Sequence, residues 1–234
     1  MASTGPRAVF LDGLGTLVAL EPPWPALVSW LARVHGVRLS DAEAERAFGA
    51  EMAYYRAHHH EGRDADALRD LRRRCAEVLR EELPRAVGSG LSIEELTAGM
   101  LGALRFRAYP DAPPALRALR ARGLRLYVVS NWDVSLPAVL AAVGLGELLD
   151  GVVTSGAVGR PKPARAIFAA ALELAGAAPA RTVHVGDSLE HDVAGARAAG
   201  IAAVLLRRAA AGPTRGAGGV PTIASLAELP GLLI

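Results

Sequence analysis

The sequence predicts an α/β fold in which a doubly wound parallel sheet is interrupted by an inserted α-helical segment. Two observations lead to this prediction. In the second half of the chain, short apolar runs alternate with segments of helical period. Between residues 20 and 105 there is no strand signal, and amphipathic helical patterns replace it. Buried strands that alternate with helices indicate a parallel sheet covered on both faces.

The predicted strands are short and apolar. The first spans residues 8–11 and ends at Asp12, and the others come only after residue 120. These later strands span residues 124–129, 152–154, 182–185, 202–206 and 220–223. The helical segments between them span residues 136–143, 164–174 and 192–199. After the last strand, Ser225 is placed to cap a final helix, and the glycine-rich residues 212–219 predict a flexible loop.

Four helical patterns rich in arginine and glutamate fill the stretch after the first strand. They span residues 24–35, 41–60, 65–83 and 92–104. Asp41, Asp64 and Ser92 are the expected N-caps. Because this helical stretch separates the first strand from the others, we expect a discontinuous core of residues 1–18 and 106–234. Residues 19–105 would then form a separate helical cap.

Composition excludes several classes of function. The chain has 234 residues and a formal net charge of only +2, which argues against a nucleic-acid partner. Its single cysteine, Cys75, excludes an intrachain disulfide. Residues 1–7 lack the apolar stretch of a signal peptide, and no apolar run is long enough to span a membrane. We therefore expect a soluble cytoplasmic protein without a membrane partner; a monomer and a homodimer are both compatible with the sequence.

Lys162 is the single lysine among 26 basic residues. Where arginine otherwise supplies the cations, a lone lysine indicates a position that needs a compact ammonium group. The alternative is an ordinary exposed lysine, which is how most lysines occur. The first interpretation is favoured by other polar residues that stand near the ends of apolar runs: Asp12, Ser130, Asp187 and Asp192.

These polar residues are expected to meet at one edge of the sheet. In open parallel sheets, ligands bind beyond the carboxyl ends of the strands. Asp12, Ser130 and Asp187 each follow a predicted strand, and Lys162 lies in a loop before a helix. Crowded carboxylates repel one another unless a cation neutralises them, and their hard oxygen atoms suit Mg²⁺. The sequence thus predicts a magnesium site that would bind a small phosphorylated molecule.

Four motifs of this chain resemble those of the haloacid dehalogenase superfamily. They are Asp12-Gly13-Leu14-Gly15-Thr16-Leu17, Ser130-Asn131, Lys162 and Gly186-Asp187-Ser188-Leu189-Glu190-His191-Asp192. The resemblance implies a Rossmann-like core. It also implies that the insert is the helical cap of the superfamily's first subgroup. The residues after Asn131, Trp132 and Asp133, are typical of its phosphatase-like branch.

The resemblance implies a role for each motif residue. Asp12 would be the nucleophile that forms an aspartyl-phosphate. Lys162 would offset the charge of the nucleophile and the phosphoryl group, and Ser130 would bind the phosphoryl oxygens, so these three are the implied catalytic residues. The implied ligands of Mg²⁺ are Asp12, the Leu14 carbonyl, Asp187 and Asp192. The implied phosphate- and substrate-binding residues are Gly13, Leu14, Thr16, Ser130, Asn131 and Lys162.

Position 14 departs from the superfamily's pattern. Phosphatases of this kind usually have a second aspartate there, which protonates the leaving group and later activates water. Leu14 cannot move a proton, so acid–base help of about 10²–10⁴ in rate is missing from its usual place. Another residue could supply it, either Glu21 or a histidine of the triplet at residues 58–60.

Three functions are compatible with these residues. The first is a Mg²⁺-dependent phosphatase for a small phosphomonoester, with weak or leaving-group-dependent turnover. The second is an L-2-haloacid dehalogenase, in which an aspartate attacks carbon without a metal and the second aspartate is also absent. The third is a binding or regulatory protein without catalysis. The presence of Asp12, Lys162, Asp187 and Asp192 together favours a hydrolase, and the pair of carboxylates at 187 and 192 favours phosphate over a 2-haloacid.

Overall fold

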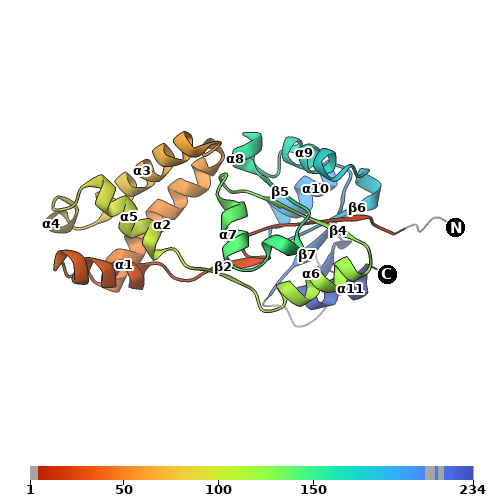
Figure 1. The fold of residues 1–234 in the computed structure, drawn as a ribbon, viewed down its shortest axis with the longest axis horizontal. Coiled ribbons are helices and arrows are strands. Elements are labelled where there is room, and N and C mark those ends of the chain that lie inside the picture. The colour runs from red at the N-terminus through yellow and green to blue at the C-terminus, as the bar shows by residue number, and fades with distance from the viewer. Residues whose placement is uncertain (1–4, 209–213, 216–218, 234) are drawn as a thin grey trace.

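The computed structural model describes residues 5–208, 214–215 and 219–233. A sheet with helices on both faces forms one end of the molecule, and a group of helices forms the other (Figure 1). The predicted fold class is confirmed: the core is a doubly wound α/β sheet, and a helical insert follows its first strand. Among the described residues, no helix combines the length and apolar character that crossing a membrane requires.

The main sheet has the strand order β5-β4-β1-β6-β7-β9-β8 over the described part of the chain. The strands span Ala8–Leu11 (β1), Arg125–Ser130 (β4), Gly151–Thr154 (β5), Thr182–Gly186 (β6), Ala202–Leu206 (β7), Thr214–Arg215 (β8) and Pro221–Ile223 (β9). Neighbouring strands are parallel except β8 and β9. After β1, the chain forms β4 and β5 on one side of this strand and then β6 and the later strands on its other side. A doubly wound sheet forms its ligand crevice where the strand order reverses in this way, here beside β1.

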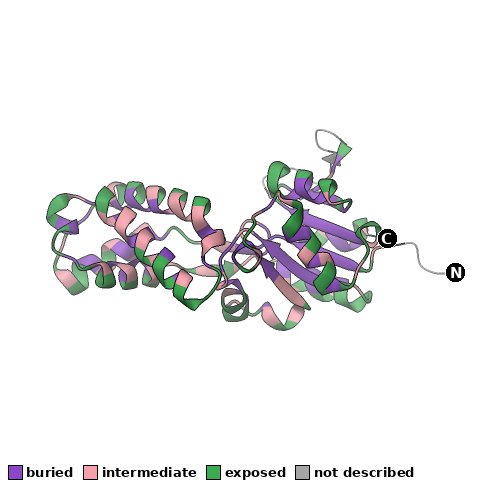
Figure 2. Cartoon of the chain, turned by 90° about the horizontal axis from the view of Figure 1, so that it is seen from above, coloured by how far each residue is buried: buried purple, intermediate pink, exposed green. Residues whose placement is uncertain are grey.

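The register of β1 places its end level with both neighbours. Leu11 pairs with Val128 of β4 and with Val185 of β6. All four residues of β1 are fully buried, as Figure 2 shows for the strands of the sheet. The residues that follow β1, β4 and β6 are therefore delivered to one edge of the sheet, next to the reversal point.

Helices cover both faces of the sheet (Figure 1). On one face lie α6 (Ala112–Ala121), α7 (Leu136–Ala142) and α11 (Leu229–Leu232). On the other lie α9 (Arg165–Ala175) and α10 (Gly195–Ala198), with the short α8 (Ser155–Val158) beside α9. Each face has its own cluster of buried apolar side chains.

The insert is a bundle with a core of its own. It consists of α1 (Trp24–Trp30), α2 (Asp41–His58), α3 (Ala65–Glu82), α4 (Arg85–Gly88) and α5 (Ile93–Ala103). A separate apolar cluster, which includes Phe48 and Leu71, fills its interior. Capping boxes begin α2 at Ser40 and α5 at Ser92. Asp64 caps α3 as predicted, whereas the cap of α2 is Ser40 and not Asp41.

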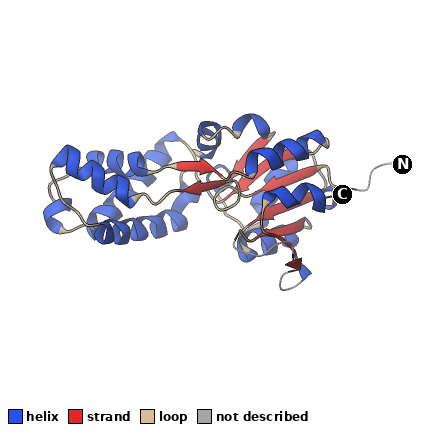
Figure 3. Cartoon of the chain, turned by 90° about the horizontal axis from the view of Figure 1, so that it is seen from below, coloured by secondary structure: helices blue, strands red, loops and turns tan. Residues whose placement is uncertain are grey.

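A two-stranded antiparallel ribbon joins the insert to the core. It pairs β2 (Val18–Leu20) with β3 (Phe106–Ala108) and lies between the two parts in Figure 3. The sequence did not predict this ribbon, because three residues per strand are too few to show a periodicity. It did not predict α6 either, whose first turn contains Pro113 and Pro114. Prolines are tolerated in a first turn, although they interrupt a helical pattern.

The predicted loop at residues 212–219 is only partly within the structure. Residues 212–213 and 216–218 lie outside the described residues. Thr214 and Arg215 form β8, which pairs antiparallel with β9, so this part is a strand and not a loop. Ser225 forms a capping box with Glu228 as predicted, but it caps the 3-10 turn Leu226–Glu228, and α11 follows this turn without a side-chain cap of its own.

Candidate active site

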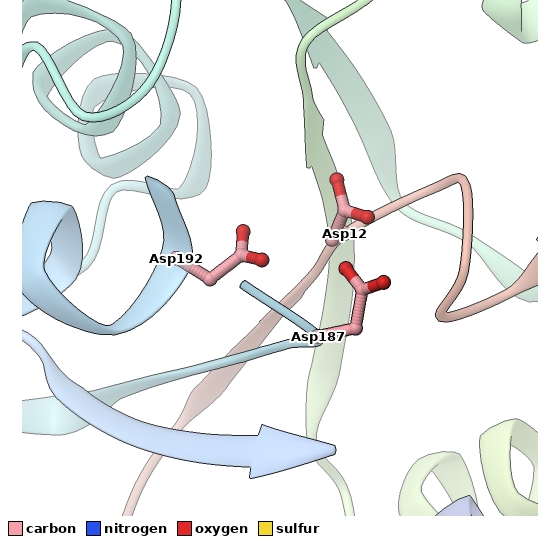
Figure 4. Close-up of side chains that lie close together, drawn as sticks. All are labelled: Asp12, Asp187 and Asp192. Atoms are coloured by element: carbon pink, nitrogen blue, oxygen red, sulfur yellow. The ribbon is translucent and has the colours of Figure 1, made fainter. Parts of the chain in front are cut away.

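Three carboxylates converge at the edge of the sheet where the strand order reverses (Figure 4). Asp12 directly follows β1, Asp187 directly follows β6, and Asp192 lies in the helical turn Leu189–Ala194. One oxygen from each lies within 4.8 Å of the others. Asp12 and Asp192 are buried and Asp187 is exposed, so the cluster is open to solvent on one side.

The amine of Lys162 lies between two of these carboxylates. Its Nζ is 2.6 Å from Asp12 Oδ1 and 2.6 Å from Asp192 Oδ1. The residue is only 3% exposed, which excludes the interpretation of an ordinary surface lysine. Asn131 holds the backbone of this lysine: Lys162 N–H donates to Asn131 Oδ1 at 2.6 Å, and Asn131 Nδ2 donates to Lys162 O at 3.1 Å.

The two ion pairs shift the ionisation of both partners. Burial acts to lower the pKa of Lys162, but the carboxylates of Asp12 and Asp192 outweigh it, so the pKa is raised. Burial acts to raise the pKa of Asp192, but Lys162 and a hydrogen bond from His184 bring it well below its usual range. Lys162 therefore stays charged despite its burial.

Asp12 keeps one oxygen free for a ligand. Its Oδ1 accepts hydrogen bonds from Lys162 Nζ and, at 3.0 Å, from Ser130 Oγ. No residue that the structure describes donates to its Oδ2. Burial raises the pKa of Asp12, and the nearby Asp192 adds to this effect while Lys162 opposes it. A cation beside Oδ2 would relieve the cost of burying this charge.

The other two carboxylates differ in how many donors they already have. Asp192 Oδ1 lies 2.9 Å from His184 Nε2, and its Oδ2 accepts from Ser188 N–H at 2.9 Å, so protein groups occupy both oxygens. Asp187 has no hydrogen-bond partner in a side chain within the described part of the chain, and burial raises its pKa, with Asp192 adding to the rise. Asp187 is consequently freer than Asp192 to ligate an ion directly.

Two glycines let these carboxylates approach the backbone. Gly15 has a φ of +86°, and a Cβ there would lie 2.3 Å from Asp187 Oδ2. A Cβ on Gly186 would lie 2.1 Å from Asp192 Cγ. Any side chain at either position would displace a carboxylate of the cluster, which explains glycine at both.

Arg208 is part of the site's support and was missed by the sequence analysis. Its guanidinium donates to the carbonyls of Gly15 and Thr16, at 3.2 and 2.6 Å. It also binds both oxygens of Asp111, at 3.1 and 2.9 Å, and lies 3.5 Å above the ring of Tyr109. One arginine therefore connects the loop after Asp12 to the start of α6. No motif reveals this, because the partners lie far apart in the sequence.

A cleft of about 930 Å³ opens from the carboxylates towards the insert. Of the expected site residues, those that line it are Asp12, Leu14, Ser130, Asn131, Lys162, Asp187 and Asp192. Gly13 and Thr16 do not line it. Thr16 is fully buried and its hydroxyl has no partner among the described residues, so its position suits the packing of the loop rather than contact with a ligand.

The walls of the cleft have two different characters. One wall is apolar and comes from the ribbon, α5 and α7: Leu20, Met100, Leu101, Leu104, Phe106, Ala138, Val139, Ala142 and Val143. The other comes from α2, α3 and the turn after α2, and carries titratable side chains: Glu51, Tyr55, Arg56, His59, His60, Arg72 and Cys75. A ligand in the cleft would meet an apolar side and a polar side.

Two of the residues considered as substitutes for the missing acid lie away from the cleft. The side chain of Glu21 is 53% exposed, and its Oε1 lies 3.8 Å from Arg107 Nε. His58 Nδ1 is bound to the carbonyl of Tyr54, on whose ring the imidazole stacks. His59 and His60 do line the cleft.

Side chains of the insert also bond directly to the core beside the site. Tyr55 donates to Asp133 Oδ2 at 2.8 Å, and His59 Nδ1 lies 2.7 Å from Ser155 Oγ. Val134 N–H donates to the carbonyl of Gly62 at 3.0 Å. These contacts join the insert to the segments that follow β4 and β5, beside the cleft.

Comparison with known proteins gives consistent matches. Residues 6–200 match a family model described as haloacid dehalogenase-like hydrolase. Haloacid dehalogenase-like hydrolase domain-containing protein 3 of Mus musculus is 34% identical over 207 residues, which cover 86% of this chain and 81% of that protein. The phosphoserine phosphatase of Thermus thermophilus is 37% identical over 133 residues, or 56% of this chain and 53% of that one. The crystal structure of a HAD phosphatase from Thermococcus onnurineus superposes with a TM-score of 0.66 at 29% identity, covering 97% of both chains.

Proposed function

Because this chain belongs to the haloacid dehalogenase-like hydrolase family, we propose that it is a Mg²⁺-dependent phosphatase that hydrolyses a small phosphomonoester. The observation that supports this most is the charge of the site. Three carboxylates, Asp12, Asp187 and Asp192, meet beside the single ammonium of Lys162. This excess of negative charge favours a bound cation, which a metal-independent dehalogenase does not use.

The residues present fit a magnesium ion. The cluster offers carboxylate oxygens close together, and hard oxygen ligands are those that Mg²⁺ prefers. Asp12, Asp187 and the Leu14 carbonyl would hold the ion, and Asp192 would support them. When bound, the ion would neutralise charge on the carboxylates and on the phosphoryl oxygens.

The first chemical step uses Asp12 as the nucleophile. Its carboxylate oxygen attacks phosphorus, the bond to the leaving-group oxygen breaks, and the leaving group departs with the electron pair. Lys162 and Ser130, which already donate to Asp12 Oδ1, would contact the phosphoryl oxygens and stabilise the charge on them. Asn131 would keep Lys162 in place through its two hydrogen bonds to the lysine backbone.

Leu14 shapes which substrates this step accepts. Leu14 lines the cleft and occupies the position where the resemblance predicts an acid, and its side chain has no proton to give. The leaving group must therefore depart as an anion or take a proton from water. We propose that turnover depends steeply on leaving-group pKa, so that a phenyl phosphate is hydrolysed far faster than an alkyl phosphate.

We further propose that residues 19–105 act as a cap that excludes water and selects the substrate. In support, the same cleft is lined by residues of the insert and of the sheet edge. The relatives support a phosphate ester as substrate, since one is a phosphoserine phosphatase and one is a HAD phosphatase.

The test is a pair of substrates, each with and without Mg²⁺. Magnesium-dependent release of phosphate from p-nitrophenyl phosphate is the expected result. Metal-independent release of chloride from L-2-chloropropionate would support the dehalogenase alternative instead. Activity on neither substrate, with Mg²⁺ still bound in calorimetry, would indicate a binding protein.

Leu14→Asp tests the role of the missing acid. We expect this variant to raise turnover of alkyl phosphates by roughly 10-fold or more and that of p-nitrophenyl phosphate much less, since only poor leaving groups need a proton. Leu14→Asn, which has the same shape and no acidic proton, is the matched control. An equal gain for both substrate classes would show that the absence of an acid at position 14 does not limit the reaction.

A further inference from the structure

One histidine of the cleft wall is fixed by the core and keeps a free nitrogen. His59 begins the helical turn after α2, is 6% exposed, and lines the same cleft as Asp12 and Lys162. Its Nδ1 lies 2.7 Å from the hydroxyl of Ser155, the residue that follows β5. This contact joins the insert to the sheet edge that carries the nucleophile.

The partners of Ser155 determine which nitrogen of His59 carries the proton. Ser155 Oγ accepts from Trp132 N–H at 2.9 Å and lies 2.9 Å from the carbonyl oxygen of Trp132. A hydroxyl has one proton to donate. All three contacts are satisfied only if Ser155 donates to the Trp132 carbonyl and accepts from both Trp132 N–H and His59 Nδ1–H. In neutral His59, Nε2 then carries the lone pair.

The Nε2 atom of His59, a residue that lines the cleft, is left without a protein partner among the described residues. Titratable groups that face His59 come from its own helix and turn, from the loop after β4 and from the core site: Tyr55, His60, Asp133, His191 and Lys162. Burial lowers the pKa of His59 to about 4, with His60, His191 and Lys162 adding to the effect and Asp133 opposing it. At neutral pH this imidazole is therefore a base and not an acid.

We propose that His59 is the base for the second chemical step, the hydrolysis of the aspartyl-phosphate on Asp12. This inference rests on the proposed phosphatase function. The oxygen of a water molecule attacks phosphorus, and a proton of that water passes to His59 Nε2. The bond between phosphorus and Asp12 breaks, its electron pair returns to the carboxylate, and inorganic phosphate is released. His59 then gives the proton to solvent.

The usual aspartate at position 14 would both protonate the leaving group and activate water, whereas in this chain only the second of these functions is retained. His59 takes a proton in the second step, through Nε2. In the first step it has none to give, because its single ring proton is bound to Ser155. The chain thus lacks acid help for the leaving group but retains base help for water.

His59→Asn tests the proposal. The amide nitrogen of asparagine can replace Nδ1 as donor to Ser155, while nothing replaces Nε2. With p-nitrophenyl phosphate, we expect a burst of about one nitrophenolate per enzyme at the wild-type rate, followed by a steady state slower by roughly 10²–10³-fold. Phosphorylated Asp12 should accumulate, which intact-mass measurement after acid quenching detects.

Two further variants separate catalysis from structure. His58→Asn makes the same change in a neighbouring histidine that does not line the cleft, and should keep wild-type kinetics. Ser155→Ala keeps the imidazole but frees its tautomer, so the steady state should slow by roughly 10-fold without loss of the burst.

The measurements distinguish a failure of the role proposed for His59 from a failure of the phosphatase function. If His59→Asn slows burst and steady state equally, or if neither changes, His59 is not the base of the second step. Should His59→Asn fail to fold by circular dichroism, a wild-type steady state in Ser155→Ala overturns the proposal. A wild-type enzyme without magnesium-dependent turnover of p-nitrophenyl phosphate refutes instead the phosphatase function on which it rests.

Discussion

The sheet edge and the insert, which together line the cleft, differ in how they hold buried charge. At the sheet edge, buried charges are paired: Lys162 contacts both Asp12 and Asp192 at 2.6 Å. On the insert, Glu51 is 5% exposed and forms no ion pair with any described residue, and burial raises its pKa to about 7 although the Cys75 thiol acts to lower it. The sheet edge is therefore preorganised, whereas the insert holds a buried carboxyl group, Glu51, that has no ion partner among the described residues.

This difference indicates that the sheet edge and the insert have different roles in the reaction. Preorganised charges stabilise a transition state without rearrangement, and they act on the phosphoryl group that all substrates share. Unpaired groups in an apolar surrounding gain most from a ligand that supplies the missing hydrogen bonds. We expect changes at the sheet edge to affect every substrate and changes on the insert to affect choice of substrate and pH dependence.

The largest expected effect comes from Asp12→Asn. Without the nucleophile, kcat should fall by at least roughly 10⁴-fold for every phosphate ester, because no aspartyl-phosphate forms. Steady-state assays with one aryl and one alkyl phosphate measure this. A loss confined to one of the two substrates would contradict the assignment of the sheet edge to the shared chemistry.

Lys162→Met should be the next most damaging change. It removes the charge that stabilises the phosphoryl group, so kcat should fall by roughly 10²–10³-fold. It also leaves Asp12 and Asp192 buried without their cation, which should lower the free energy of unfolding by about 3 kcal/mol. Urea denaturation measures this loss, and added Mg²⁺ should recover part of it. Full activity in Lys162→Arg would show that the compact ammonium is not required.

A smaller effect is expected at Arg208, which contacts the site only through the loop after Asp12. Arg208→Gln should lower kcat roughly 10-fold with little change in KM, since it loosens the nucleophile and not the substrate. Arg208→Lys should behave similarly, because lysine cannot bind Asp111 and two carbonyls at once. Equal rises in KM for both variants would place Arg208 in binding instead.

Glu51→Gln tests the wall of the insert and should have the smallest effect. Since the pKa of Glu51 rises from 4.5 to about 7 on folding, its protonated form stabilises the protein below pH 4.5, and this is lost as the pH rises through 7. Glutamine stays neutral, so the variant should gain roughly 1–3 kcal/mol over wild type at pH 8 and little at pH 4.5.

His59 also makes the free energy of unfolding depend on pH, and both proteins in that comparison must therefore retain it. Its pKa falls from 6.5 to about 4 on folding, so its contribution has the opposite sign to that of Glu51. Its contribution is present above pH 6.5 and is lost as the pH falls towards 4. Urea midpoints of Glu51→Gln and wild type at the same pH values cancel this contribution. If the two proteins differ in stability by the same amount at pH 4.5 and at pH 8, Glu51 is not a buried carboxyl group without an ion partner.

The parts of the fold that the sequence predicts are those with a local signal. The strands at 8–11, 182–185 and 202–206 are apolar runs of the length a buried strand needs, and each appears within one residue of its predicted bounds. The ribbon of β2 and β3 has no such signal. The ribbon forms where the chain leaves the core and re-enters it. Strands of three residues are too short to reveal this position in the local sequence.

The site divides in the same way. The grouping of Asp12, Ser130, Lys162 and Asp187 could be foreseen, because parallel strands end at one edge of a sheet. The contacts of Arg208, Tyr55 and His59 could not. In each of these contacts the two residues are separated by between 78 and 193 positions in the sequence. Such contacts depend on how whole helices and strands pack against one another.

The central position of β1 has a consequence for how the chain is made. Its first residue, Ala8, pairs with Arg125 on one side and Thr182 on the other. During synthesis, β1, which is fully buried in the folded protein, therefore emerges well before both of the strands that cover its edges. The helices of the insert contact one another over short stretches of chain and can fold in the meantime. We expect ribosome-bound fragments in which the insert has emerged but β4 has not to contain a folded helical bundle and an exposed, aggregation-prone β1.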